Sequence, residues 1–481
     1  LELPESVGEL KLLHYLDLSK TEIRRLPNSV CNLINLETLK LLSCLWLFEL
    51  PKDLGKLTNL QHLELDDIFW YKLRTLPPGI GSITGLQNLH AFPVSREAGK
   101  GINELKGMLH LKGALHIKEL ENAANAGEAN LKDKEDLVKV VFEWSNNRNG
   151  SPENAALDEN IIEDLQPHPD IKEIQVIHYQ GARFPAWIRD GQVKNLTSLT
   201  LNHCINCRVL SLGQLSRLQS LSLKGNLELE EWIDAPYHFL HRLNISNCPK
   251  LRDTPKIFLN LGAMKIKKCN SLKALPLIPS VMFLKLMHNL VLEDFNEHTV
   301  ILGSVNNHGQ PVHVRQPSFI KLLELKVIDC PKLPCLPEVF APQKLEVSGC
   351  PLLTKLPTPE FSQRLQHLAI DACDDPTLVR AIPDTGSLYS LVISNISNLT
   401  SFPKWPHLSG LKTLYISRCN DLTSLSDETA ASVPFEGMTS LELLSVRGCP
   451  NLVRFPDKEL PATLKCLSIS SNSGLMSLGP E

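Results

Sequence analysis

The stretch "LKTLYISRCNDLTSL", residues 411–425, decides the fold. Its apolar residues follow the frame LxxLxLxxCxxLxxL, with Cys419 three positions after the strand-like Leu414-x-Ile416 step. The same frame returns at residues 240–251, 365–373 and 441–455. A chain that returns to one short frame in this way is built by repeating one structural unit.

Weaker copies of the frame share a spacing of about 20 to 24 residues, which is the leucine-rich repeat period. They begin at Leu13, Leu36, Leu60, Leu137, Ile171, Leu196, Leu218, Leu261, Val281, Leu322, Leu388 and Leu464. In each copy the LxL step predicts a short strand whose apolar side chains alternate inward. We therefore predict an α/β repeat solenoid: a leucine-rich repeat horseshoe with one short parallel strand per repeat on the concave face and a mostly irregular convex side.

Nine cysteines occupy the slot three residues after the LxL step, and we interpret them as a structural ladder. They are Cys44, Cys204, Cys248, Cys269, Cys330, Cys350, Cys373, Cys419 and Cys449. A thiol fills space there as a small hydrophobe and bonds weakly to backbone, while asparagine fills the slot at Asn226, Asn289 and Asn472. The alternatives are a zinc half-site at Cys204-x-x-Cys207 and disulfides. No second CxxC follows, and 13 cysteines is an odd number, so we predict no metal site and a reducing compartment.

We predict one solenoid over residues 1–481, with roughly nineteen units and a start in the middle of a repeat. Recurrent Leu-Pro and Phe-Pro steps, such as Leu26-Pro27, favour irregular connecting segments. Four irregular insertions are expected, at 93–136, 145–168, 294–318 and 426–437. The first contains "LENAANAGEANLKDKEDL", which favours a helix by composition, and the second predicts a loop followed by a short helix near Ile161.

Composition and motifs exclude several functions. The formal charge is -4 over 481 residues, without the basic excess of a nucleic-acid binder. No apolar run is long enough for a membrane span, and no HExxH, GxSxG or GxxxxGK[ST] motif is present. We predict a protein that is not an enzyme and has no catalytic or cofactor-binding residues in this chain.

Two longer segments resemble a known family. The segment "HLKGALHIKELENAANAGEANLKDKEDLVKVVFEW", residues 110–144, is similar to the family segment GxLxIxxLENV…EAxxAxLxxKxxLxxLxLxW. The segment "LQPHPDIKEIQVIHYQGARFPAWI", residues 165–188, is similar to LxPxxxLKxLxIxxYxGxxFPxW. The chain thus resembles the repeat region of plant intracellular nucleotide-binding leucine-rich repeat disease-resistance proteins of the coiled-coil class. Departures are Ala123 in place of valine, and Val140 and Phe142 in place of leucines.

The resemblance implies a cytoplasmic recognition module in plant defence and innate immunity, in a receptor that is also nuclear or membrane-associated in some cases. Its expected partners are a pathogen effector or an effector-modified host protein, and the receptor's own nucleotide-binding domain, which the repeats restrain. ADP or ATP is expected in that upstream domain and not in this chain. The open alternative is a repeat scaffold of another class, a ubiquitin-ligase adaptor or a cell-surface receptor ectodomain.

Candidate partner-binding residues lie at exposed strand positions. Lys265, Lys285 and Lys326 would stack along the concave face, with Lys267 and Lys268 beside the first, and repel one another unless an acidic partner docks. A solvated stripe is the alternative. Aromatic candidates are Tyr389, Tyr415 and the trio Phe69, Trp70 and Tyr71, which either anchors a partner or covers a loop. Trp144 and Trp187 are assigned to packing.

Overall fold

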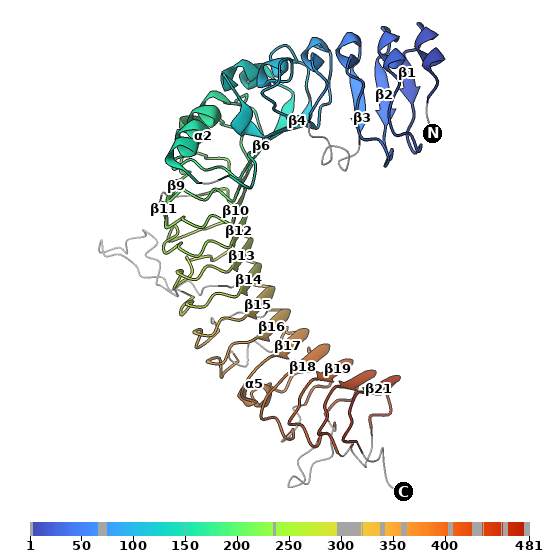
Figure 1. Cartoon of the computed structure of the whole chain (residues 1–481). Helices are drawn as coiled ribbons and strands as arrows, with labels where there is room; N and C mark the ends of the chain where they lie inside the picture. Colours follow the sequence, from blue (N-terminus) through green and yellow to red (C-terminus); the bar gives the residue numbers. More distant parts are fainter. Residues whose placement is uncertain are drawn as a thin grey trace, which may run out of the picture. The chain divides into compact units, whose positions relative to one another are not determined.

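The protein was examined as a computed structural model (Figure 1). The structure describes residues 3–65, 75–148, 150–233, 237–295, 319, 321–336, 342–356, 363–402, 407–425, 435, 437–453, 455 and 460–475. Two compact units divide the chain, Leu1–Phe239 and Leu240–Glu481. Parallel strands dominate both units, so each is described in terms of its strands.

The first unit begins with a parallel sheet of β1 (Tyr15–Asp17), β2 (Thr38–Leu41) and β3 (His62–Leu65). A second parallel ladder runs in chain order through β4 (Ala91–Pro93), β5 (Gly113–Lys118), β6 (Leu137–Glu143), β7 (Glu173–Ile177), β8 (Ser198–Asn202) and β10 (Ser220–Lys224). A separate parallel pair joins β9 (Val209–Ser211) to β11 (Glu231–Ile233).

Helices of the first unit lie in the segments that connect the strands. In the described part of this unit two are α-helices, α2 (Pro152–Asp164) and α3 (Ala186–Arg189). The others are short 3-10 helices: η1 (Glu5–Glu9), η2 (Asn28–Asn32), η3 (Leu54–Lys56), η4 (Ile80–Ser82), η5 (Ile102–Leu105), η6 (Leu120–Asn122), η7 (Ala126–Ala129) and η8 (Leu131–Asp133).

The second unit is one parallel ladder, and its connecting segments carry one short helix in the described residues, α5 (Thr377–Arg380). Its strands, in order, are β12 (Arg242–Ser246), β13 (Ala263–Lys267), β14 (Phe283–Met287), β15 (Glu324–Ile328), β16 (Lys344–Ser348), β17 (His367–Asp371), β18 (Ser390–Ser394), β19 (Thr413–Ser417), β20 (Leu443–Arg447) and β21 (Cys466–Ser470). The predicted repeat solenoid, with short parallel strands and mostly irregular connections, is confirmed.

The alternation of side chains explains the ladder. In β17 the second and fourth residues, Leu368 and Ile370, are buried, while the three between and around them are half-exposed. Strands pair in register, so Leu345 stands opposite Leu368 and Leu391 follows on the next strand. The buried positions thus form continuous apolar rows, and burial of these rows is the main stabilising contribution.

Many strands are followed directly by a residue with a left-handed backbone. This feature was not predicted from the sequence. These residues include His178, His203, Gly225, Asn247, Lys268, His288, Asp329, Gly349, Ala372, Asn395, Arg418, Gly448 and Ser471. The turn directs the next residue, the cysteine or asparagine slot, back into the interior. Glycine and asparagine recur in this row because they tolerate positive φ best, and that recurrence was the available signal in the sequence.

Two predictions about the insertions differ from the structure. The helix predicted within residues 93–136 is wrong, because Glu119, Asn125 and Asn130 adopt positive φ and divide the segment into η6, η7 and η8. The same range also contains β5, a repeat strand that the analysis missed. The helix expected near Ile161 is present as the longer α2. Residues 296–318 and 426–434 lie outside the described residues.

Candidate partner-binding face

The candidate site is the exposed face of the parallel ladder, which the strands build from their first, third and fifth residues. In β13 these are Ala263, Lys265 and Lys267, and the strand's two other residues are buried. Neighbouring strands hold the equivalent residues in register, so side chains of different repeats form rows across the face. Each row position can change without disturbing the apolar interior.

The predicted lysine stripe falls on this face but differs from a row of mutually repelling charges. Lys265 stands opposite Lys285, and Lys285 opposite Lys326. However, Lys285 Nζ lies 3.3 Å from a carboxylate oxygen of Glu324, and Lys326 forms an ion pair with Glu346. Acidic residues therefore neutralise two of the three lysines within the fold.

Glu346 is the centre of this neutralised part of the face. Its carboxylate also lies 2.6 Å from Lys344 Nζ. Partial burial pushes the pKa of Glu346 up, but hydrogen bonds and the charges of Lys326 and Lys344 outweigh that effect and hold its pKa below the usual value. The carboxylate is therefore ionised at neutral pH, and its lysine partners are not free to bind an acidic ligand without competing with it.

The aromatic candidates are placed further along the second unit. Tyr415 is the third residue of β19 and is exposed, and Tyr389 immediately precedes β18 with half its surface exposed. Lys412 Nζ lies 5.4 Å from the centre of the Tyr389 ring, a cation–π distance. Phe69, Trp70 and Tyr71 lie outside the described residues, so their role stays a prediction.

Serine and threonine accompany these tyrosines. The exposed strand positions around Tyr415 hold Ser390 and Ser394 on β18, and Thr413 and Ser417 on β19. Tyrosine supplies contact area at low entropic cost and hydroxyls supply adaptable hydrogen bonds, the combination that protein-binding surfaces of antibodies use. This part of the face is chemically suited to a protein partner.

Behind the face, all nine slot cysteines are buried and are free thiols. In several repeats the sulfur lies near the carbonyl of the last strand residue, as for Cys350 Sγ at 3.3 Å from the oxygen of Ser348. Burial raises the pKa of the Cys350 and Cys207 thiols to about 12. Among the described residues, no group of three or more His, Cys, Asp or Glu side chains is placed to hold a metal ion.

Asparagines in the slot bond more strongly than the cysteines. Asn226 accepts a hydrogen bond from the backbone N–H of Cys204 at 2.9 Å and donates one to the carbonyl of Leu201 at 3.2 Å. Asn289 and Asn472 make the same pair of contacts to the preceding strand. Each amide therefore links two neighbouring repeats through groups that would otherwise be buried and unpaired.

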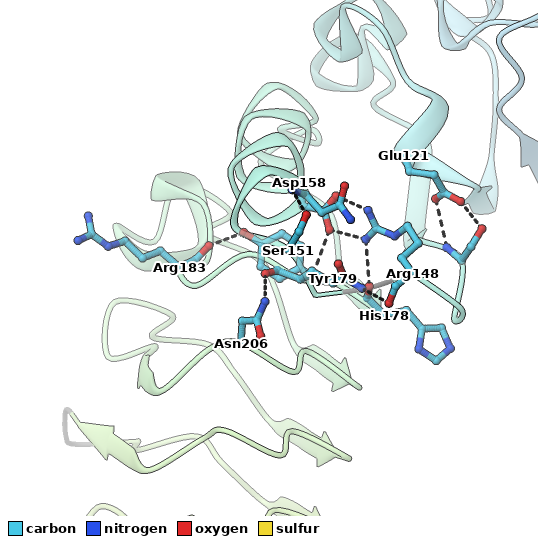
Figure 2. A network of polar contacts seen from close by, with 11 residues as sticks. Glu121, Arg148, Ser151, Asp158, His178, Tyr179, Arg183 and Asn206 are labelled. Carbon is cyan, nitrogen blue, oxygen red and sulfur yellow. Dashed lines mark hydrogen bonds and ion pairs between the residues drawn. The ribbon is translucent and has the colours of Figure 1, made fainter.

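A polar network fixes α2 to the ladder in the first unit (Figure 2). The Arg148 guanidinium donates to both carboxylate oxygens of Asp158, at 2.9 and 2.6 Å, and Asp158 is completely buried. Asp158 also accepts a hydrogen bond from the backbone N–H of Gln180 at 3.0 Å. Ser151 caps the helix by accepting from the N–H of Asn154. The repeat frame gives no signal for this ion pair, because Arg148 and Asp158 lie in an insertion between strands.

Aromatic rings pack beside the network. Trp144 and Trp187 are buried, as their assignment to packing requires. The Trp144 ring centre lies 5.3 Å from that of Tyr179, and Trp187 Nε1 donates to the carbonyl of Ile162 in α2 at 3.0 Å. Tyr179 OH donates to the carbonyl of Arg183. The contact between Trp144 and Tyr179 connects the two segments that carried the family resemblance.

The repeat frame, the parallel ladder and the buried slot together define a leucine-rich repeat protein. A family model described as R13L1/DRL21 LRRs matches residues 102–226, the segment that holds α2 and its network. The chain is similar to the leucine-rich repeats of plant disease-resistance proteins, as the resemblance predicted.

Curated relatives carry this similarity over most of the chain. A putative disease resistance protein of Arabidopsis thaliana is 28% identical over 97% of this chain and 39% of its own length. The putative disease resistance RPP13-like protein 1 of the same plant is 30% identical over 88% of this chain and 37% of its own length. The chain therefore spans about two fifths of the length of these relatives.

Two solved structures match most of this chain at low sequence identity. The TLR13–ssRNA13 complex matches with 17% identity and a TM-score of 0.45, covering 96% of this chain and 72% of that one. YopM from Yersinia enterocolitica matches with 17% identity and a TM-score of 0.42, covering 95% and 92%. None of the helices in the described part of the chain has the length and apolar character needed to span a bilayer.

Proposed function

We propose that this chain is the recognition and autoinhibition module of an intracellular plant immune receptor and acts by binding proteins on the exposed face of its ladder. The observation that carries the proposal is the contrast between the buried and the exposed rows of strand residues. Buried strand positions in the described residues are apolar with the exception of Ser445 on β20, whereas exposed positions vary from lysine and glutamate to tyrosine and serine. Such a face can change its specificity while the fold is kept.

The bound protein is proposed to be a pathogen effector or a host protein altered by one. Plant disease-resistance relatives support this class of partner, and leucine-rich repeats are typically binding scaffolds and not enzymes. The receptor's nucleotide-binding domain is the second proposed partner, and it is where ADP or ATP would bind. We also propose that the receptor acts in the cytoplasm and that no residue of this chain is catalytic.

Tyr389 and Tyr415 are the proposed anchors for the sensed protein, because exposed tyrosines on a rigid strand or directly beside one lose little entropy on binding. The test screens the chain against secreted pathogen proteins and their host targets by split-luciferase complementation in leaf cells, followed by titration of the purified pair. The variant is Tyr389→Ala with Tyr415→Ala. Its control is Leu290→Ala with Leu352→Ala, two exposed apolar side chains outside the strands.

A tenfold or larger loss of affinity in the tyrosine variant, with little change in the control, is the expected result. If both variants bind as tightly as the unmodified chain, the partner binds elsewhere, and the proposal that these tyrosines anchor it is wrong. Restraint is tested separately, by deleting the repeats from the receptor that contains them. The receptor without its repeats is expected to trigger defence signalling in the absence of a pathogen. If it does not signal, the proposal of autoinhibition is contradicted.

A further inference from the structure

One part of the second unit's exposed face is basic, and among its five cations Lys285 alone has an acidic partner in the described residues. We define the basic patch as Arg242 on β12, Lys265 and Lys267 on β13, Lys268 immediately after β13, and Lys285 on β14. The other exposed strand positions of β12 to β14 are Asn244, Ser246, Ala263, Phe283 and Met287. No acidic residue occupies an exposed position on these three strands.

Register places the charges of the patch close together. Lys265 stands directly opposite Lys285 on the neighbouring strand, and like charges in that arrangement destabilise a sheet. Glu324 relieves Lys285 from the other side, at 3.3 Å. Within the described residues, no ion pair involves Lys265, Lys267 or Lys268. Within the described part of the chain, no acidic side chain therefore neutralises these three lysines.

An exposed apolar edge adjoins the charges. Phe283, the first residue of β14, is 40% exposed, and Met282 before it is 39% exposed. Their β13 neighbours are Ala263, opposite Phe283, and Gly262, and neither has a side chain large enough to cover the ring. The patch thus combines several cations with one aromatic anchor, and desolvated aromatic residues contribute most to protein interfaces.

We propose that the basic patch binds an acidic segment of a protein partner, with carboxylates on Lys265 and Lys267 and an apolar side chain on Phe283. The proposal rests on the proposed function only in that the partner is a protein. Three strands span about 10 Å, which suits a short extended segment. A nucleic acid is disfavoured, because its binding depends on many phosphate contacts while this chain is net negative and offers an apolar anchor here.

The test uses the purified full chain and a fluorescein-labelled peptide in which glutamate alternates with leucine, measured by fluorescence anisotropy. The variant is Lys265→Glu with Lys267→Glu. A matched control, Lys273→Glu with Lys355→Glu, makes the same change in net charge at exposed lysines outside the strands. Circular dichroism checks folding, and Lys265→Gln with Lys267→Gln removes the charges without reversing them.

We expect the patch variant to lose at least tenfold in affinity and the glutamine variant to lose part of it, with the control unchanged. Affinity should fall as salt rises, and Phe283→Ala should weaken binding at every salt concentration. Equal loss in the control would show a non-specific charge effect and overturn the proposal. Equal binding of a glutamine-leucine peptide, or stronger binding of a single-stranded oligonucleotide, would also overturn it. Because the peptide is not a pathogen protein, failure here leaves effector sensing at Tyr415 standing.

Discussion

At the scale of single residues, the Arg148 and Asp158 pair decides whether α2 stays on the ladder. Burial raises the pKa of Asp158, whereas the hydrogen bonds and charge of Arg148, together with the N–H of Gln180, oppose that rise. An ionised carboxylate without Arg148 would be left in an apolar setting. Removing one partner therefore destabilises the fold by more than the intact pair stabilises it.

We predict that Arg148→Met destabilises the first unit by about 3–5 kcal/mol. The measurement is urea denaturation followed by tryptophan emission, since Trp144 and Trp187 lie beside the network. Arg148→Met with Asp158→Leu should recover most of the loss, because no buried charge then remains unpaired. A single variant as stable as the unmodified chain would mean that Asp158 is neutral in the fold.

Lys134 is the second buried charge in the first unit, and it makes stability depend on pH. Its ammonium donates to the carbonyls of Leu105 at 2.7 Å and Met108 at 3.0 Å, and burial lowers its pKa to about 8. Between about pH 8 and its ordinary value of 10.5, the unfolded chain holds more protons at this site than the folded chain does. Stability therefore rises with pH in that window.

The expected contribution of Lys134 is a slope of at most about 1.4 kcal/mol per pH unit between pH 8 and 10.5. Because other groups titrate there too, the measurement is the difference between the unmodified chain and Lys134→Met in urea denaturation at several pH values. The difference should change by that slope in favour of the unmodified chain as pH rises. A difference that is constant with pH would show that the ammonium keeps its ordinary pKa.

At the scale of elements, the left-handed residue that follows many of the strands connects the ladder to the interior slot. Gly349 and Gly448 both occupy this position, with φ of 61° and 65°. A Cβ on Gly349 would lie 2.1 Å from Asp329 Oδ1, whereas a Cβ on Gly448 would meet nothing closer than Arg418 at 3.7 Å. Asp329 is itself held by His288, whose Nδ1 lies 2.7 Å from Asp329 Oδ2.

Alanine at these two glycines should therefore have unequal costs. Gly448→Ala is expected to cost about 1 kcal/mol, from the left-handed backbone alone. Gly349→Ala is expected to cost more than about 2 kcal/mol, because the methyl group also displaces Asp329 from His288. Thermal and urea denaturation of the two variants gives the comparison. Equal losses would mean that Asp329 moves aside freely.

Sequence periodicity predicted the elements that repeat and missed those held by tertiary contacts. Leu414 and Ile416 identify a strand because alternation is local to a few residues. The segment with η6 to η8 has the composition of a helix, yet positive φ at Asn125 and Asn130 divides it. Strand β5 was hidden because Leu111 precedes Leu115 by four residues, where the LxxLxL frame needs three, and because Leu120 stands in the slot of the cysteines.

For the candidate site, the sequence predicted where the lysines lie better than it predicted whether they are ion-paired. Alternation placed Lys265, Lys285 and Lys326 on one face, and register in the structure sets them side by side. It did not show that Glu324 neutralises Lys285, because the residues joined by that contact belong to repeats separated by an insertion. Charge compensation between repeats depends on register, which a single sequence shows only approximately.

At the scale of the whole molecule, the burial of the cysteines predicts how the folded chain reacts with a thiol reagent. Of the 13 free thiols, Cys335 and Cys466 are exposed and the others are buried. Burial also raises the pKa of Cys31 and Cys269 to about 11, so these two form little reactive thiolate near neutral pH. The hydrogen bond with Cys419 lowers the pKa of Cys449, but burial keeps that thiol away from the reagent. We expect Ellman's reagent to label two thiols rapidly in the native chain and all 13 in guanidinium chloride. The control, Cys335→Ser with Cys466→Ser, should show no rapid reaction. Fewer than 13 thiols after denaturation of freshly purified chain would mean that some are joined as disulfides, and rapid labelling of more than two would mean that the ladder opens in the folded protein.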